Sequence, residues 1–131
     1  MKSMSYVFIR LGIGISMLGH GLVRIPKLTA FSEGMLNNFK DSLLPNFMLI
    51  PFTYALPFVE FLIGFLLILG WQTKNAAVIG GVLMLILIGG TSLIENWGAL
   101  PSQMIHLLFF VLVYEFNQSN TLALDKSQGS N

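Results

Sequence analysis

The chain has 131 residues, of which 54% are hydrophobic and only 10% are charged. Soluble domains carry about 25% charged residues, so this composition excludes an ordinary soluble domain and indicates an integral membrane protein. The net charge of +1 at pH 7 argues against nucleic-acid binding, which needs a basic surface. Because the sequence has no cysteine, it cannot form disulfides, cysteine-ligated zinc sites, iron–sulfur clusters or covalently attached haem.

Four apolar segments are long enough to cross a bilayer, whose ~30 Å hydrocarbon core needs a helix of about 20 residues. The predicted spans cover approximately residues 5–24, 52–70, 75–94 and 102–116. They predict an all-α fold, a four-helix transmembrane bundle that forms one domain over residues 1–131. The basic residues on the two sides nearly balance, and we expect the N-terminus to be cytoplasmic.

The first span carries small residues on the same helical face as its charges. On the 3.6-residue period this face contains Arg10, Gly14, Met17, Gly21 and Arg24. Small residues in a membrane helix allow a neighbouring helix to approach closely. We therefore expect this face to pack against another span.

The connection between the first two spans, residues 25–51, has a helical pattern of its own. Its apolar residues recur on one face: Leu28, Phe31, Met35, Phe39 and Leu43. Its polar residues fall on the other face: Glu33, Asn37, Lys40 and Asp41. This pattern predicts an amphipathic helix that lies on the membrane surface or caps the bundle. Pro26 and Pro51 are expected to bracket the connection, and Pro45 to break it before the second span.

The residues after the last span, 117–131, are polar and are expected to form a short tail that is mobile at its end. Asp125 and Lys126 belong to this tail. We expect Asp125 to be solvated and Lys126 to lie on the cytoplasmic side.

Two charged residues interrupt the apolar spans. Glu60 is the only charge between residues 51 and 71, and Arg10 lies within the first span. A charge in hydrocarbon is costly and marks a bundle interior, a pairing partner or a functional site. At 1.5 Å of rise per residue, Glu60 falls near the middle of the membrane and Arg10 roughly a quarter of the way across. One interpretation is a structural ion pair between Arg10 and Glu60 that fixes the register of the helices.

A second interpretation, compatible with the first, is a polar pocket. His20 and His106 fall at similar depths, and Arg24 lies at the outer boundary of the first span. A carboxylate and an imidazole at mid-depth can exchange protons with a quinone headgroup. Here Glu60 and His20 would be the catalytic residues, and Arg10, His106 and Arg24 would complete the binding site with them. No metal site is predicted. Ligation of a b-type haem by the two histidines is a minor alternative, and the simpler interpretation against it is that each histidine forms ordinary hydrogen bonds between helices.

Several stretches together resemble the DoxX family. The first span, RLGIGISMLGHGLVRIPKL, resembles the first helix of that family in its order of arginine, glycines, a His-Gly pair and a basic residue. LPFVEFLIGFLLILGWQTKNAAVIGGVLML resembles the second helix and hairpin, with Glu60 at the position of the membrane glutamate. NTLALDK resembles the C-terminal end, with Leu124 and Asp125, whereas ENWGALPSQM departs from the family pattern.

The resemblance implies a four-helix protein of the bacterial inner membrane, in a family that includes subunits of a thiosulfate:quinone oxidoreductase. The first functional hypothesis is therefore a membrane subunit of a quinone-linked oxidoreductase, not a complete enzyme, which binds quinone between its helices. A partner subunit, or the quinone itself, would carry the electrons; a homo-oligomer is an alternative assembly. The second hypothesis is a non-catalytic membrane anchor or assembly partner that uses residues 25–51 as a docking surface. A solute transporter is less favoured because no inverted repeat is evident.

Overall fold

The computed structural model describes residues 1–125 of the chain, so the prediction for Lys126 lies outside the described residues. The elements in chain order are α1 (Ser3–Arg24), η1 (Ile25–Lys27), α2 (Leu28–Asn38), α3 (Asn46–Leu69), α4 (Thr73–Leu93), η2 (Trp97–Ala99), α5 (Leu100–Glu115) and η3 (Asn117–Ser119). The described part of the chain contains no strand. Four of its helical segments are long and apolar enough to cross a membrane. These findings confirm the predicted all-α, four-helix membrane bundle.

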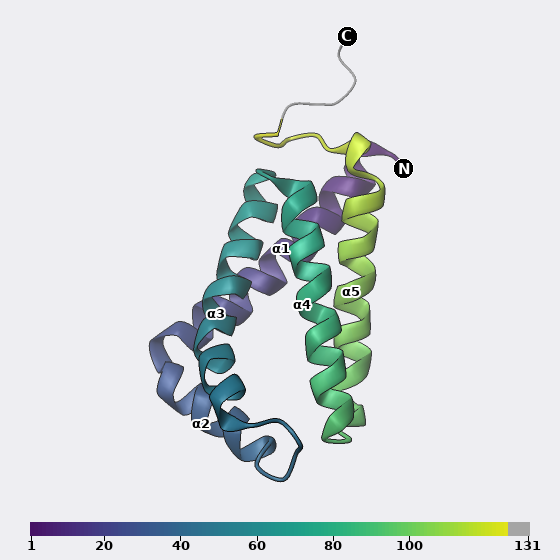
Figure 1. Cartoon of the computed structure of the whole chain (residues 1–131). Helices are drawn as coiled ribbons and strands as arrows, with labels where there is room; N and C mark the ends of the chain where they lie inside the picture. The colour runs from purple at the N-terminus through teal and green to yellow at the C-terminus, as the bar shows by residue number, and fades with distance from the viewer. Residues whose placement is uncertain (126–131) are drawn as a thin grey trace.

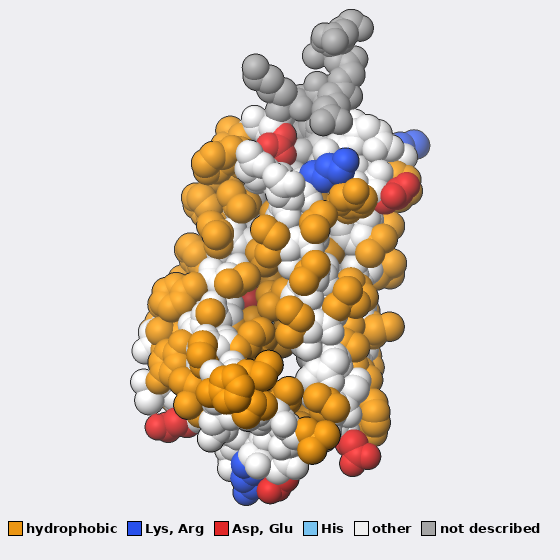
Figure 2. Space-filling view, viewed as in Figure 1, with side chains coloured by type: hydrophobic (Ala, Val, Ile, Leu, Met, Phe, Trp, Pro, Cys, Tyr) orange, Lys and Arg blue, Asp and Glu red, His pale blue; other side chains and the backbone are white. Residues whose placement is uncertain are grey.

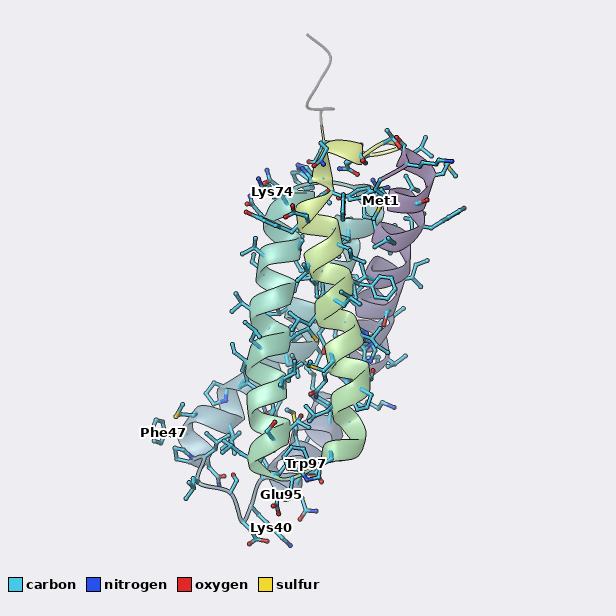
Figure 3. All side chains as sticks on the ribbon, turned by 90° about the vertical axis from the view of Figure 1, so that its right-hand side faces the viewer. Met1, Lys40, Phe47, Lys74, Glu95 and Trp97 are labelled. Atoms are coloured by element: carbon cyan, nitrogen blue, oxygen red, sulfur yellow. The ribbon has the colours of Figure 1, made fainter. Side chains whose placement is uncertain are left out.

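The helices pack mainly as two pairs. α1 packs along α3, α4 packs along α5, and α2 folds back against α3 (Figure 1). α3 and α4 are joined by a tight turn and diverge away from it. Met1 and Lys74 lie at one end of the bundle, here called the tail end, and Lys40, Glu95 and Trp97 lie at the other, the loop end (Figure 3).

Hydrophobic side chains cover most of the middle of the molecule, while lysine, arginine, aspartate and glutamate gather mainly towards the two ends (Figure 2). Large apolar side chains are exposed on every span, among them Phe8, Leu62, Ile79 and Leu108. Contiguous apolar surface of this extent suits lipid and not water. The surface therefore agrees with a protein that spans the bilayer.

The two helices of the first pair touch through their backbones. A Cβ atom on Gly64 of α3 would overlap the backbone of Leu18, and one on Gly21 of α1 would overlap the carbonyl of Pro57. A Cβ on Gly14 would lie 3.1 Å from the Cβ of Leu67. Because only glycine fits at this crossing, the expectation of a close helix approach on this face of α1 is confirmed.

The second pair is held by an aromatic ring that lies over a glycine. A Cβ on Gly80 of α4 would overlap the ring of Phe110 of α5. Phe110 and Val113 are fully buried and join the core that the four spans share. The remaining core residues are Tyr6, Ile13, Met17, Leu56, Ile63, Leu67, Ala76, Ala77, Leu83 and Met84.

The second span begins earlier than the sequence predicts. α3 starts at Asn46, with Pro45 in an extended conformation as its N-cap, and both Pro51 and Pro57 lie inside the helix. The expectation that Pro51 ends the connection is therefore wrong. Proline removes one helical hydrogen bond, and membrane helices tolerate this loss because neighbouring groups satisfy the freed carbonyl.

The predicted amphipathic helix is α2, and it caps the loop end of the bundle. Phe31 and Met35 pack against the core. Ser32 is buried, and its hydroxyl forms a 2.6 Å hydrogen bond with the hydroxyl of Thr53 on α3. The predicted apolar face does not extend to Leu43, which is 93% exposed, because α2 ends at Asn38.

Asp125 is partly exposed and is also bound to the start of α4, a contact that the expectation of a solvated side chain did not include. Its carboxylate accepts hydrogen bonds from the backbone N–H groups of Gln72 and Thr73, at 2.8 and 2.9 Å. The backbone N–H of Asp125 donates to the carbonyl of Gly70 at 2.8 Å. The first N–H groups of a helix lack partners inside the helix and favour negative charge. Asp125 therefore caps α4 from the far end of the chain.

Arg10 does not pair with Glu60, so the predicted ion pair is wrong. The Arg10 side chain is 1% exposed, and its guanidinium donates to the side chain of Asn120 and to the carbonyls of Thr121 and Leu122, the latter two at 2.9 Å. Arg10 lies near the tail end of α1, where the returning chain supplies oxygen acceptors within reach. The charge thus fixes the tail over this end of the bundle.

Replacing Gly64 with alanine should lower the free energy of unfolding in detergent by about 1–3 kcal/mol, because the added methyl group displaces the α1 backbone. Gly12→Ala is the matched control, since nothing lies within 4 Å of a Cβ at Gly12. The control should be neutral or slightly stabilising. Chemical unfolding followed by circular dichroism measures both variants, and equal effects would contradict the proposed crossing.

Arg10→Met should destabilise the protein by roughly 2–4 kcal/mol, because it removes hydrogen bonds from a charged donor. It should also release residues 117–125 to a protease of broad specificity. Limited proteolysis with mass spectrometry measures the release, and Lys2→Met, at an exposed cation of the same end, is the control. A tail that stays protected in Arg10→Met would show that Arg10 does not hold it.

Candidate functional site

A cavity of about 500 Å³ lies between the two helix pairs. All five α-helices contribute to its wall, mostly through their loop-end halves. On the face seen in Figure 2, the surface is hollowed between α3 and α4, the two helices that diverge in Figure 1. Ligand-binding pockets typically measure about 300–1,000 Å³, so this cavity is large enough for a small molecule.

Glu60 is held in this cavity by Arg24. Nη1 of Arg24 donates to both carboxylate oxygens of Glu60, at 3.2 and 3.0 Å. The side chain of Glu60 is 4% exposed and that of Arg24 is 28% exposed. The guanidinium carbon of Arg24 also lies 4.6 Å from the ring centroid of Phe31, a cation–π geometry. The buried carboxylate therefore has a cationic partner on α1, but the partner is Arg24 and not Arg10.

Local sequence explains why Arg24 reaches Glu60. Gly21 places the backbone of α1 against the carbonyl of Pro57, and Arg24 follows Gly21 by one helical turn on the same face. Glu60 follows Pro57 by the same interval on α3. The close crossing of the two helices thus brings the charged side chains together without a long reach by either one.

The two histidines lie beside each other in the same cavity. Their ring centroids are 5.6 Å apart and the rings are nearly perpendicular, at 87°. Nδ1 of His20 is 2.7 Å from the carbonyl of Ser16, and Nδ1 of His106 is 2.7 Å from the carbonyl of Ser102. A ring nitrogen bound to a carbonyl carries the proton, so Nε2 of each neutral ring is an acceptor.

The two acceptor nitrogens have different surroundings. Nε2 of His106 lies 2.8 Å from the hydroxyl of Ser16, which donates to it. Nε2 of His20 has no hydrogen-bond partner within residues 1–125. Haem ligation by both rings would require Nε2 of His106 to give up its hydrogen bond with the Ser16 hydroxyl. His20 is therefore the histidine that can accept a hydrogen bond or a proton from a bound molecule.

A glutamine and a threonine that sequence reasoning missed also line the cavity. Nε2 of Gln103 on α5 donates to Oγ1 of Thr91 on α4 at 2.8 Å. Oε1 of Gln103 is buried and lacks a partner in the described part of the chain. Gln103 precedes His106 by one helical turn, so the two residues lie on the same face of α5. This spacing was the only feature of the sequence that could have indicated that Gln103 lines the cavity.

The rest of the cavity wall is mostly apolar and adaptable, with Asn38, Asn96 and Ser102 as its other polar residues. Four methionines contribute to it: Met17, Met35, Met48 and Met84. Phe31, Phe39 and Phe52 supply aromatic surface. Methionine side chains adjust to irregular ligands, so the cavity suits a molecule with a polar group at one edge and an apolar body.

The structure brings together four of the predicted site residues: His20, Arg24, Glu60 and His106 all line this cavity. Arg10 does not line it and lies instead beneath the tail. The gathered groups can donate a hydrogen bond through Arg24 and accept one through Glu60 or His20. The site can therefore hold a ligand that carries oxygen atoms, and it can exchange protons with that ligand.

Arg24→Met should destabilise the protein by on the order of 3 kcal/mol, because it leaves the Glu60 carboxylate buried without a partner. Adding Glu60→Gln should restore part of the loss, which a double-mutant cycle on unfolding free energies measures. Lys27→Met, at an exposed cation in the next turn, is the control. The same cycle between Arg10 and Glu60 should be additive, and strong coupling there would contradict the observed pairing.

Comparison with known proteins identifies the family. The sequence model of the DoxX family matches residues 5–97 of this chain, so the chain belongs to the DoxX family and the resemblance seen in the sequence is confirmed. The matched region includes His20, Arg24 and Glu60 but ends before His106. No curated protein and no solved structure matches the chain.

Proposed function

We propose that the cavity binds the headgroup of a membrane quinone and that the protein is the membrane subunit of a quinone-linked oxidoreductase. One observation carries the proposal. The Arg24–Glu60 ion pair and Nε2 of His20, which has no hydrogen-bond partner within residues 1–125, line a cavity of about 500 Å³ within a membrane-spanning bundle. A buried carboxylate is costly, and within membrane segments such groups mark functional sites.

The polar groups match both redox forms of a quinone. The carbonyl oxygens of the oxidised form accept hydrogen bonds, and Arg24 is a donor. The hydroxyl groups of the quinol donate hydrogen bonds, and the Glu60 carboxylate and Nε2 of His20 are acceptors. The apolar wall packs against the ring, and its methionines and phenylalanines tolerate ring substituents.

Proton exchange is the chemical contribution of this chain. Reduction of a quinone takes up two electrons and two protons, and oxidation of the quinol releases them. In this proposal Glu60 and His20 accept the protons that leave a quinol or supply those that a quinone takes up. The electrons pass to or from a partner subunit, because this chain has no cysteine that could ligate an iron–sulfur cluster.

The proposed ligand enters from the side. α3 and α4 diverge towards the loop end. Met48 and Phe52 of α3 and Ile86 and Leu87 of α4 all line the cavity. An isoprenoid tail that leaves between these helices would remain in the hydrocarbon of the bilayer. Lateral entry explains why the hollow opens on an apolar face of the molecule.

The proposed location is the bacterial inner membrane, with the N-terminus in the cytoplasm. Family membership supports this membrane, and Lys2 and Lys74 lie together at the tail end with the N-terminus. The cavity would then lie nearer the outer surface of the membrane. Protons would accordingly exchange with the outer aqueous phase.

Purified wild-type protein should retain quinone in near-stoichiometric amount, and Glu60→Gln should lose at least about nine tenths of it, because the neutral amide forms no ion pair that holds Arg24 in place and cannot take up a quinol proton. Organic extraction and mass spectrometry quantify the quinone. Glu95→Gln is the matched control, since Glu95 is exposed at the loop end and does not line the cavity.

A folded Glu60→Gln variant that retains its quinone would contradict the proposed role of Glu60. Absence of quinone from the wild-type protein, together with no binding of added quinone, would contradict the proposed function. The non-catalytic anchor would then be the better account of this chain.

A further inference from the structure

Gln103 presents an exception to the rule that buried polar atoms are hydrogen-bonded. Its Oε1 is buried without a partner in the described part of the chain, while its Nε2 is engaged by Thr91 at 2.8 Å. An unsatisfied buried acceptor is costly and needs a specific explanation. Gln103 lines the cavity, so a rotation of its side chain would bring this enclosed oxygen to a ligand there.

The position of Gln103 complements that of the ion pair. Glu60 and Arg24 come from the α1–α3 pair, whereas Gln103 and Thr91 come from the α4–α5 pair. The cavity lies between the two pairs. In the proposed complex, a ring with oxygen atoms at opposite positions contacts Arg24–Glu60 through one oxygen and Gln103 through the other.

We propose that Gln103, held by Thr91, is the second binding point for the quinone headgroup and that it binds both the oxidised and the reduced form of the headgroup. This inference rests on the proposed function. The amide carries an acceptor at one end and a donor at the other, and the hydroxyl of Thr91 can donate or accept.

The observed arrangement suits the quinol. Nε2 of Gln103 donates to Thr91, and Oε1 can accept a hydrogen bond from a quinol hydroxyl once the side chain turns it towards the cavity. If the amide turns end over end, Oε1 accepts from the hydroxyl of Thr91 and Nε2 donates to a quinone carbonyl. In both states every polar atom of the amide end has a partner.

The Arg24–Glu60 ion pair cannot switch between donor and acceptor by turning a side chain end over end. Arg24 only donates, and Glu60 changes from an acceptor to a donor only when it takes up a proton. A site that turns over must hold both the substrate and the product of one redox couple. A reversible amide therefore keeps the far oxygen bound while protons move at Glu60 and His20.

The test compares Gln103→Met with the wild-type protein in detergent micelles. Equilibrium dialysis measures the binding of decylubiquinone and of its quinol, with menadione as a naphthoquinone probe. Both redox forms should bind roughly five- to tenfold more weakly to the variant, because one hydrogen bond is lost for each. The thermal midpoint of the ligand-free variant should not fall, because methionine has a similar size and removes the unpartnered acceptor.

Gln118→Met, at an exposed glutamine of the tail end, is the matched control and should bind both forms normally. Gln103→Asn is a second variant that keeps the amide but withdraws it from the cavity. It should weaken both forms as well, so the proposal stays testable if Gln103→Met does not fold.

The outcomes separate this inference from the proposed function. Normal binding of both forms to folded Gln103→Met would overturn the role of Gln103 alone. A lowered thermal midpoint with normal binding would also overturn it, since Gln103 would then serve only to link α4 and α5. A wild-type protein that binds none of the probes would overturn the proposed function and this inference with it.

Discussion

The backbone contact between α1 and α3 is the constraint on which the rest of the structure depends. Gly21 and Gly64 leave no space for a side chain at this crossing, so the two helices are fixed in depth and rotation relative to each other. This register brings Arg24 to Glu60, and the buried carboxylate gains a partner that offsets its cost in the membrane. Within the second helix pair, Phe110 packs over Gly80, and the cavity lies between the two pairs.

Two sets of polar groups in the bundle have different tasks. At the tail end, Arg10 and Asp125 bind backbone groups of a single returning segment and of the start of α4. These contacts close that end of the bundle. Towards the loop end, Glu60 and His20 line a cavity and keep acceptor atoms in it. The first set explains how the fold is completed, and the second set supports the proposed chemistry.

The sequence predicted the spans and the amphipathic helix because apolar length and helical periodicity are local properties. It also predicted the face of α1 that packs, since glycines at helical spacing allow close approach. The partner of Arg10 could not be predicted. Every residue has a backbone carbonyl, so the sequence does not show which carbonyls of the tail accept hydrogen bonds from Arg10. Gln103 was missed for a related reason: an uncharged amide near a span boundary resembles any interfacial residue. Depth estimates did group Glu60 with both histidines, but they could not decide which arginine reached it.

Photochemical cross-linking with an azido-quinone tests the account most directly, because it reports where the ligand lies. Purified protein is labelled with and without excess unlabelled decylubiquinone, and the modified peptides are mapped by mass spectrometry. The account predicts competed labels within residues 17–24, 84–91 and 99–106, which line the cavity from three helices. Labels confined to outward-facing residues such as Phe8, Ile79 and Leu108, or labels that are not competed, would contradict a quinone site between the helices.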